Sequence, residues 1–200
     1  PDNFLNRFLF CPSYRVHISF MLLIIIVSAI ITYLIHPDIQ STINSVSSNI
    51  PKSVERKTGF DLVVAYIINN GLKVPLQMLI LGLIPVPFLY WLQPVLTAIL
   101  PGILFGIGFN MSFTKGITIV ISSLPHMLTE ILALCFWIVA LDRINKWMRN
   151  KISKKKNNST QFMDEIKQLL TSYVKYVLPL IVIASFLETY VADWISNFLN

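Results

Sequence analysis

Long apolar stretches alternate with short polar segments along most of the chain. A bilayer core about 30 Å thick is crossed by roughly 20 apolar residues in a helix. Stretches of this kind, one of them rather short, predict five spans at about residues 16–35, 72–92, 95–109, 124–141 and 174–194. The pattern therefore predicts one all-α integral membrane domain over residues 1–200, built as a bundle of transmembrane helices.

Two further apolar stretches are too short to cross a bilayer. Residues 60–70 cover about half a span and are followed by Gly71, a helix-stop signal, which predicts a short helix lying at the membrane interface. Residues 117–121 predict a re-entrant segment, with Ser123 capping the fourth span. A tight turn at 93–94 is expected between the second and third spans.

The composition excludes several classes of protein. Hydrophobic residues make up 54% of the chain and charged residues only 13%, and the mean hydropathy is +0.66. Soluble domains have about 25% charged residues, so an ordinary cytosolic enzyme, a disordered chain and a nucleic-acid-binding domain are excluded. Two cysteines, Cys11 and Cys135, are too few for a disulfide framework and are expected to be free thiols.

The distribution of basic residues predicts the orientation in the membrane. The net charge is +6, and eight of the sixteen Lys and Arg residues lie in the loop 142–173 between the fourth and fifth spans. Because short cytoplasmic loops carry the excess of Lys and Arg, this loop is expected in the cytoplasm. Five spans then place the N-terminus in the cytoplasm and the C-terminus outside the cell membrane.

Three ionisable side chains lie away from the ends of the predicted spans. His126 and Glu130 are four residues apart and share one face of a helix. Glu130 lies six residues after the start of the fourth span and Glu188 six residues before the end of the fifth, about 9 Å deep in each case. Since consecutive helices usually pack together, these three side chains are expected to form one intramembrane cluster.

Three roles are open for this cluster. It could fix the register of two helices through an interhelical hydrogen bond, or carry a proton or cation shared between the carboxylates. It could also bind Zn²⁺ through three ligands with a position left for water. No residue is assigned a catalytic role. Because the sequence holds no phosphate-cradling Gly-Lys-Ser/Thr loop, an ATP-driven process would need another chain.

Other residues are candidates for contacts. Gly102 and Gly106 are four residues apart, a spacing that allows two helices to approach closely, and Ala184 lies one turn before Glu188 on the same stripe. Basic side chains after the fourth span serve as a topological anchor or contact anionic lipid or a cytoplasmic partner. These are Arg143, Lys146, Arg149, Lys151, Lys154, Lys155 and Lys156.

Two motifs resemble one known family. Residues 123–134, Ser-Leu-Pro-His-Met-Leu-Thr-Glu-Ile-Leu-Ala-Leu, and residues 178–191, Leu-Pro-Leu-Ile-Val-Ile-Ala-Ser-Phe-Leu-Glu-Thr-Tyr-Val, resemble the signature of the stage II sporulation protein M family. Asn69-Asn70 and the glycine-rich stretch 101–108 also fit, so the resemblance covers about residues 60–194. The chain departs from the pattern at Pro101, where many members have Asn, and at Met127, where the family has Gly.

The resemblance implies a bacterial cell-membrane protein with about five spans, similar to the broader branch of the family outside sporulation. It predicts a membrane subunit or scaffold of an envelope assembly. Such an assembly would export a peptide or bacteriocin, or confer immunity, with a separate ABC-type ATPase, or would remodel the cell wall with a peptidoglycan hydrolase. The alternative is an intramembrane metalloenzyme or proton-coupled carrier built on the cluster. The expected surroundings are a lipid bilayer without nucleic acid, and self-association is open.

Overall fold

The computed structural model describes residues 12–38, 57–153 and 162–199. All regular structure in these ranges is helical. Five helices are long and apolar enough to cross a membrane: Tyr14–Ile35, Gly59–Leu83, Leu89–Met111, Phe113–Ile152 and Phe162–Leu199. The predicted all-α architecture with five spans is therefore confirmed, and the chain is a multi-pass membrane protein.

Several spans are composed of more than one helical segment. The first is α2 (Pro12–Ile35) and the fourth is α7 (Phe113–Ile152). The second consists of α4 (Gly59–Tyr66), the π-helix η1 (Ile67–Lys73) and α5 (Val74–Leu83), and the third of the 3₁₀-helix η2 (Leu89–Trp91) and α6 (Leu92–Met111). The fifth runs through α8 (Phe162–Ser172), the π-helix η3 (Tyr173–Val177), α9 (Leu178–Phe186), the π-helix η4 (Leu187–Val191) and α10 (Ala192–Leu199).

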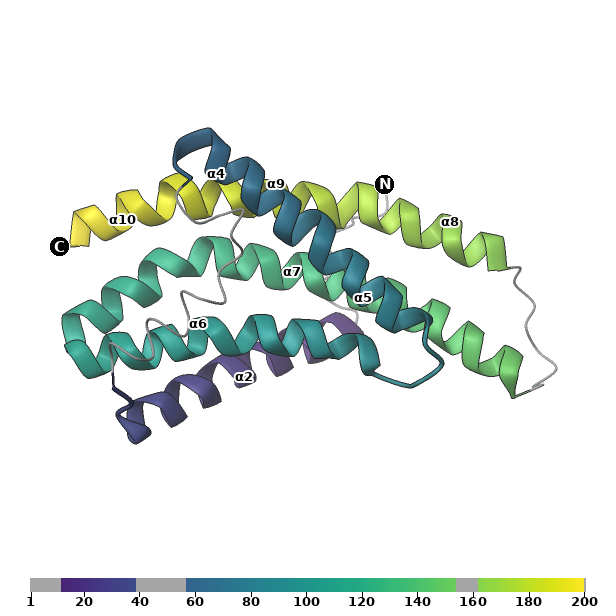
Figure 1. The fold of residues 1–200 in the computed structure, drawn as a ribbon, viewed down its shortest axis with the longest axis horizontal. Helices are drawn as coiled ribbons and strands as arrows, with labels where there is room; N and C mark the ends of the chain where they lie inside the picture. Colours follow the sequence, from purple (N-terminus) through teal and green to yellow (C-terminus); the bar gives the residue numbers. More distant parts are fainter. Residues whose placement is uncertain (1–11, 39–56, 154–161, 200) are drawn as a thin grey trace.

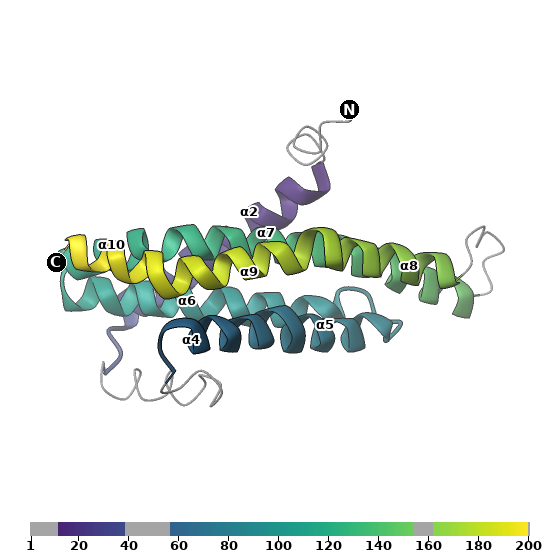
Figure 2. The same ribbon diagram turned by 90° about the horizontal axis from the view of Figure 1, so that it is seen from above.

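Helix α7 is the centre of the bundle. In Figure 1 it lies between α6 on one side and the continuous rod of α8, α9 and α10 on the other, and α4 and α5 cross in front. Figure 2 shows α2 crossing the bundle at an angle. Half of the most apolar window of α7 is buried, compared with 17% for α2, so α7 organises the core and α2 lies at its edge.

The core is packed around the second half of α7. Ile138, Leu141 and Ile144 have no exposed surface, and Met78 of α5 is equally buried against them. The Nε1 of Trp137 donates a hydrogen bond of 3.0 Å to the main-chain oxygen of Pro75. Apolar packing and this buried bond together hold α5 against α7.

The predicted short helices at 60–70 and 117–121 do not exist as separate elements. The helix that begins at Gly59 continues through Gly71 to Leu83, because η1 joins α4 to α5. Residues 117–121 lie inside α7, whose start is capped by Ser112, with its Oγ accepting a bond of 3.1 Å from the backbone N–H of Lys115. In an apolar environment, a continuous helix satisfies its backbone groups internally, which favours continuation over a break.

The turn between the second and third spans is at 84–88 rather than at the predicted 93–94. Pro94 is buried near the start of α6, where proline is accepted. Phe88 adopts a left-handed conformation with φ of 63°. Asn145, which is fully buried, donates from Nδ2 to the main-chain oxygens of Gly82, Ile84 and Val86 at 2.9, 2.7 and 3.3 Å. This side chain holds the turn against α7.

The predicted basic loop is also largely helical. Helix α7 continues to Ile152, and α8 begins at Phe162, so only a short connection separates the fourth and fifth spans. The amphipathic character of α8 fits this arrangement, since it buries Leu169 against α7 and exposes most of its polar side chains. Cys135 is a free, buried thiol, as expected, and Cys11 lies outside the described residues.

Candidate functional site

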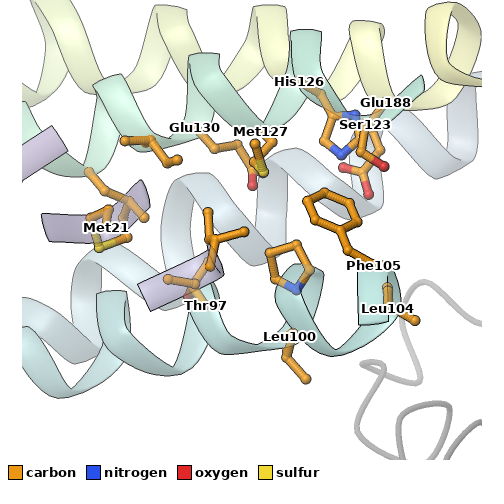
Figure 3. Close-up of a pocket in the computed structure, with 15 residues that line it drawn as sticks. Met21, Thr97, Leu100, Leu104, Phe105, Ser123, His126, Met127, Glu130 and Glu188 are labelled. Carbon is orange, nitrogen blue, oxygen red and sulfur yellow. The ribbon is translucent and has the colours of Figure 1, made fainter. Parts of the chain in front are cut away.

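The structure brings the three predicted ionisable side chains together. His126 and Glu130 extend from α7 and Glu188 from η4, and all three line one cavity of about 240 Å³ in the bundle interior. Figure 3 shows them pointing into this cavity, with Phe105 of α6 on the opposite wall. Glu130 and Glu188 are close enough to interact electrostatically. The three side chains predicted to form one cluster therefore share one cavity, while their depth in the bilayer stays a prediction.

Side chains of the second span complete the site. Asn70 donates from Nδ2 to Oε1 of Glu130 at 2.5 Å, and Asn69 donates to Oδ1 of Asn70 at 2.8 Å. The side chain of Tyr66 lies near the carboxyl group of Glu188. The second, fourth and fifth spans therefore all contribute polar side chains to the site.

Of the three π-helical segments in the described part of the chain, two carry residues of this site. Asn70 lies in η1 and Glu188 in η4. A π-helical turn inserts one extra residue into an α-helix, so the residues that follow it face a different side of the helix. Such turns are frequent at functional sites. The π geometry thus directs polar side chains into the bundle from helices that are otherwise apolar.

Proline accounts for the hydrogen bonding of η1. In an α-helix the carbonyl of Gly71 would accept a bond from the N–H of residue 75, but Pro75 has none. The hydroxyl of Tyr173 in η3 donates to this carbonyl instead. The absence of a Cβ at Gly71 permits close packing, because an added Cβ would lie 3.3 Å from Cγ2 of Ile181. The second and fifth spans are therefore joined directly beside the polar site.

His126 keeps an unused hydrogen-bonding atom. Its Nδ1 is buried and has no partner among the described residues. Ser123 and Thr97 also line the cavity, whereas most of the remaining wall is apolar. Because His126 lines the same cavity as the two carboxyl groups, this ring nitrogen can bond to a small polar molecule held there.

The cluster does not have the geometry of a metal centre. In the ranges that the structure describes, no three His, Cys, Asp or Glu side chains are grouped closely enough to hold a metal ion. The zinc hypothesis, with or without an enzymatic role, therefore gains no support from this arrangement. The carboxylate pair, with the amide donor of Asn70 on Glu130, is instead suited to a proton or a cationic group.

The small residues mediate contacts within the chain. An added Cβ would lie 1.9 Å from Oγ of Ser28 at Gly102, and 2.6 Å from Cβ of Thr32 at Gly106. Both glycines therefore pack closely against α2 of the same chain, as their four-residue spacing suggests. Ala184 is fully buried within the bundle.

The basic residues at the end of α7 have local partners. Arg143 donates to Oε1 of Gln168 at 3.0 Å, Arg149 donates from Nε to Oδ1 of Asn145 at 3.0 Å, and Nζ of Lys151 lies 5.2 Å from the ring centroid of Trp147. Nζ of Lys146 lies 2.5 Å from Oδ2 of Asp142. The remaining three, Lys154, Lys155 and Lys156, fall outside the described residues.

Sequence reasoning did not assign three of the polar residues described here. Tyr66 and Asn70 fall in the stretch expected to form a separate interfacial helix, and Asn145 falls in the expected loop. A usable signal exists for Asn145, since it follows Leu141 by four residues and therefore shares the buried face of α7. No comparable signal identifies Tyr66.

The helical bundle with polar residues in its interior defines a polytopic membrane protein. The family model described as Stage II sporulation protein M matches residues 17–193. The chain therefore belongs to the stage II sporulation protein M family, as its motifs indicated. No curated protein and no solved structure matches the chain.

Proposed function

We propose that this chain is a membrane subunit that binds positive charge, a proton or a small cation, between Glu130 and Glu188. The observation that carries the proposal is the placement of two carboxyl groups from different spans on the wall of one interior cavity. Ionisable groups inside a membrane are costly and are usually linked to function. The proposed role is therefore binding of a proton or small cation, and no Zn²⁺ site is proposed.

Electrostatics supports a shared proton or cation. Two negative charges inside an apolar bundle repel each other strongly because little water screens them. A proton or cation held between the carboxyl groups removes this repulsion. Asn70 donates a hydrogen bond to Glu130 and orients that carboxyl group. The Nδ1 of His126, which has no partner among the described residues and belongs to the wall of the same cavity, offers a further site for the proton.

Dicyclohexylcarbodiimide tests this role, since it is an apolar reagent that modifies protonated carboxyl groups inside membranes. We expect the purified chain to take up the reagent at Glu130 or Glu188, and the rate to rise as the pH is lowered. Mass spectrometry of the peptides identifies the modified residue. The double variant Glu130→Gln with Glu188→Gln preserves shape and is expected to lose the modification.

An exposed carboxyl group provides the matched control. Asp193 lies on the same span as Glu188 but at the surface, so Asp193→Asn is expected to react like the unaltered chain. Modification that persists in the double glutamine variant would contradict the proposal. If the cluster only fixes helix register, Glu188→Gln lowers stability and leaves partner binding and activity intact at a permissive temperature.

A second role concerns the surroundings of the subunit. We infer from family membership and the basic end of α7 that the chain works within an envelope assembly. A separate ATPase would make it part of a peptide or bacteriocin export or immunity system, and a peptidoglycan hydrolase would make it a scaffold for wall remodelling. Mild extraction of the tagged chain from its native membrane, followed by mass spectrometry of co-purifying proteins, distinguishes these roles.

The orientation is part of this proposal. The excess of Lys and Arg beyond the fourth span supports a cytoplasmic position for the end of α7 and an extracytoplasmic position for α10. Single cysteines at exposed Lys151 and Asp193, in a background without Cys11 and Cys135, test it with a membrane-impermeant maleimide. In intact cells, only the cysteine at 193 is expected to react.

A further inference from the structure

The polar cavity adjoins a second, larger cavity on the side of the bundle. This lateral groove has a volume of about 830 Å³ and lies between α2, α6 and α7. Ile25, Phe105 and Met127 line both spaces. The polar cavity and the groove therefore adjoin at these three side chains.

The lateral groove is apolar and opens toward the lipid. Ile26, Ile30 and Phe113 line it and are 55%, 52% and 72% exposed. In a bilayer, side chains with this exposure on a transmembrane span contact acyl chains. A long apolar tail can therefore occupy the groove without displacing any part of the protein.

The polar cavity offers the opposite chemistry. It presents two carboxyl groups and an unpartnered ring nitrogen, and none of the described residues that line it is Lys or Arg. A group that is positively charged and carries several N–H donors matches these acceptors, whereas a phosphate group would be repelled. Its volume of about 240 Å³ suits a small head group rather than a whole lipid.

We propose that the two cavities together bind a cationic amphiphile, with an ammonium head between Glu130 and Glu188 and an apolar tail in the lateral groove. The molecule would enter sideways from the bilayer. Met127 is unbranched and flexible, so it can move aside and admit the head without a rearrangement of helices. This inference rests on the proposed function, because it uses the same carboxylate pair as a site for positive charge.

Three simple probes separate the parts of the proposal. Dodecylammonium has both head and tail, dodecanol has the tail without charge, and butylammonium has the head with a short tail. The chain is placed in phosphatidylcholine nanodiscs with each probe at neutral pH, and native mass spectrometry of the released protein counts the bound molecules. We expect dodecylammonium to bind about tenfold more tightly than dodecanol, as hydrogen bonds to a charged group predict, and butylammonium to bind weakly.

Variants test the head and tail sites separately. The double variant Glu130→Gln with Glu188→Gln is expected to remove the preference for dodecylammonium over dodecanol. Ile30→Trp fills the lateral groove and is expected to weaken both dodecyl probes. Ile31→Trp is the matched control, because Ile31 is 50% exposed on the same helix but lines a different groove.

Each outcome decides the question. Equal binding of dodecylammonium and dodecanol, or a preference that survives the double glutamine variant, overturns the proposal. Equal effects of Ile30→Trp and Ile31→Trp also overturn it, since the tail would then lie elsewhere. If carbodiimide still modifies Glu130 or Glu188 while the amphiphile fails to bind, the proton site stands and only this inference is wrong.

Discussion

Alanine in place of Gly102 is expected to push α2 away from α6. The added Cβ would lie 1.9 Å from Oγ of Ser28 and 2.5 Å from the main-chain oxygen of Ile25. The serine side chain can rotate, but the carbonyl belongs to the backbone of α2. The helix itself must therefore move, and the contact between α2 and α6 opens.

The expected change in the free energy of unfolding follows from two opposing effects. Overpacking of a close contact costs about 1–3 kcal/mol. Alanine is a better helix former than glycine by up to about 1 kcal/mol, which offsets part of this cost. We expect Gly102→Ala to lower the free energy of unfolding by about 1–2 kcal/mol. Ser28→Ala in the same chain should recover only part of the loss, because the Ile25 carbonyl remains in place.

Unfolding by sodium dodecyl sulfate, followed by tryptophan fluorescence, measures this change. Gly82→Ala is the matched control, since its Cβ would lie 3.1 Å from Cδ2 of Leu141, the far end of a flexible side chain. The control should be clearly less destabilising than Gly102→Ala. Equal losses in the two variants, or a gain in stability at Gly102, would refute the reasoning.

Three further predictions concern the free energy of unfolding and are tested by the same unfolding in sodium dodecyl sulfate. Asn145→Ala removes the side-chain donor to three main-chain oxygens near the turn 84–88, of which the Ile84 oxygen keeps the N–H of Val86, and should cost about 2–4 kcal/mol. An unchanged midpoint would show that the turn does not depend on Asn145. Tyr173→Phe removes the donor to the Gly71 carbonyl and should cost about 1–2 kcal/mol. The cost should be much smaller in a Pro75→Ala background, because residue 75 then has an N–H that can bond to this carbonyl. Equal costs in both backgrounds would show that Tyr173 does not replace the N–H that Pro75 lacks. Lys146→Ala should cost under about 0.5 kcal/mol because its side chain is 62% exposed, and a larger loss would show a buried role.

The number of spans followed from the sequence because it depends on one simple quantity. Apolar length decides whether a helix can cross the bilayer. This length does not depend on the details of side-chain packing, so the number of spans survives errors in the helix boundaries. The depth of Glu130 stays a prediction, because it is counted from Leu124 whereas α7 begins at Phe113.

The contribution of the second span could not be predicted in the same way. Gly71 is a helix-stop signal in water, yet here the helix continues through it, and its carbonyl accepts a hydrogen bond from Tyr173, 102 residues further along the chain. A contact over that distance leaves no local pattern. The π-helix η1 also interrupts the 3.6-residue periodicity of the second span. The orientation of Tyr66 and Asn70 can therefore not be predicted from the α-helical spacing of apolar residues.

The dependence of α2 on Gly102 and Gly106 has a consequence for the order of assembly. Helix α2 precedes α6 in the chain, so during synthesis it enters the bilayer before the surface that it packs against exists. Until α6 follows, it must remain stable as a lone helix in lipid, and it has the highest mean hydropathy of the five spans. Insertion and docking of this helix are therefore separate events, and a glycine substitution that blocks docking should leave its insertion intact.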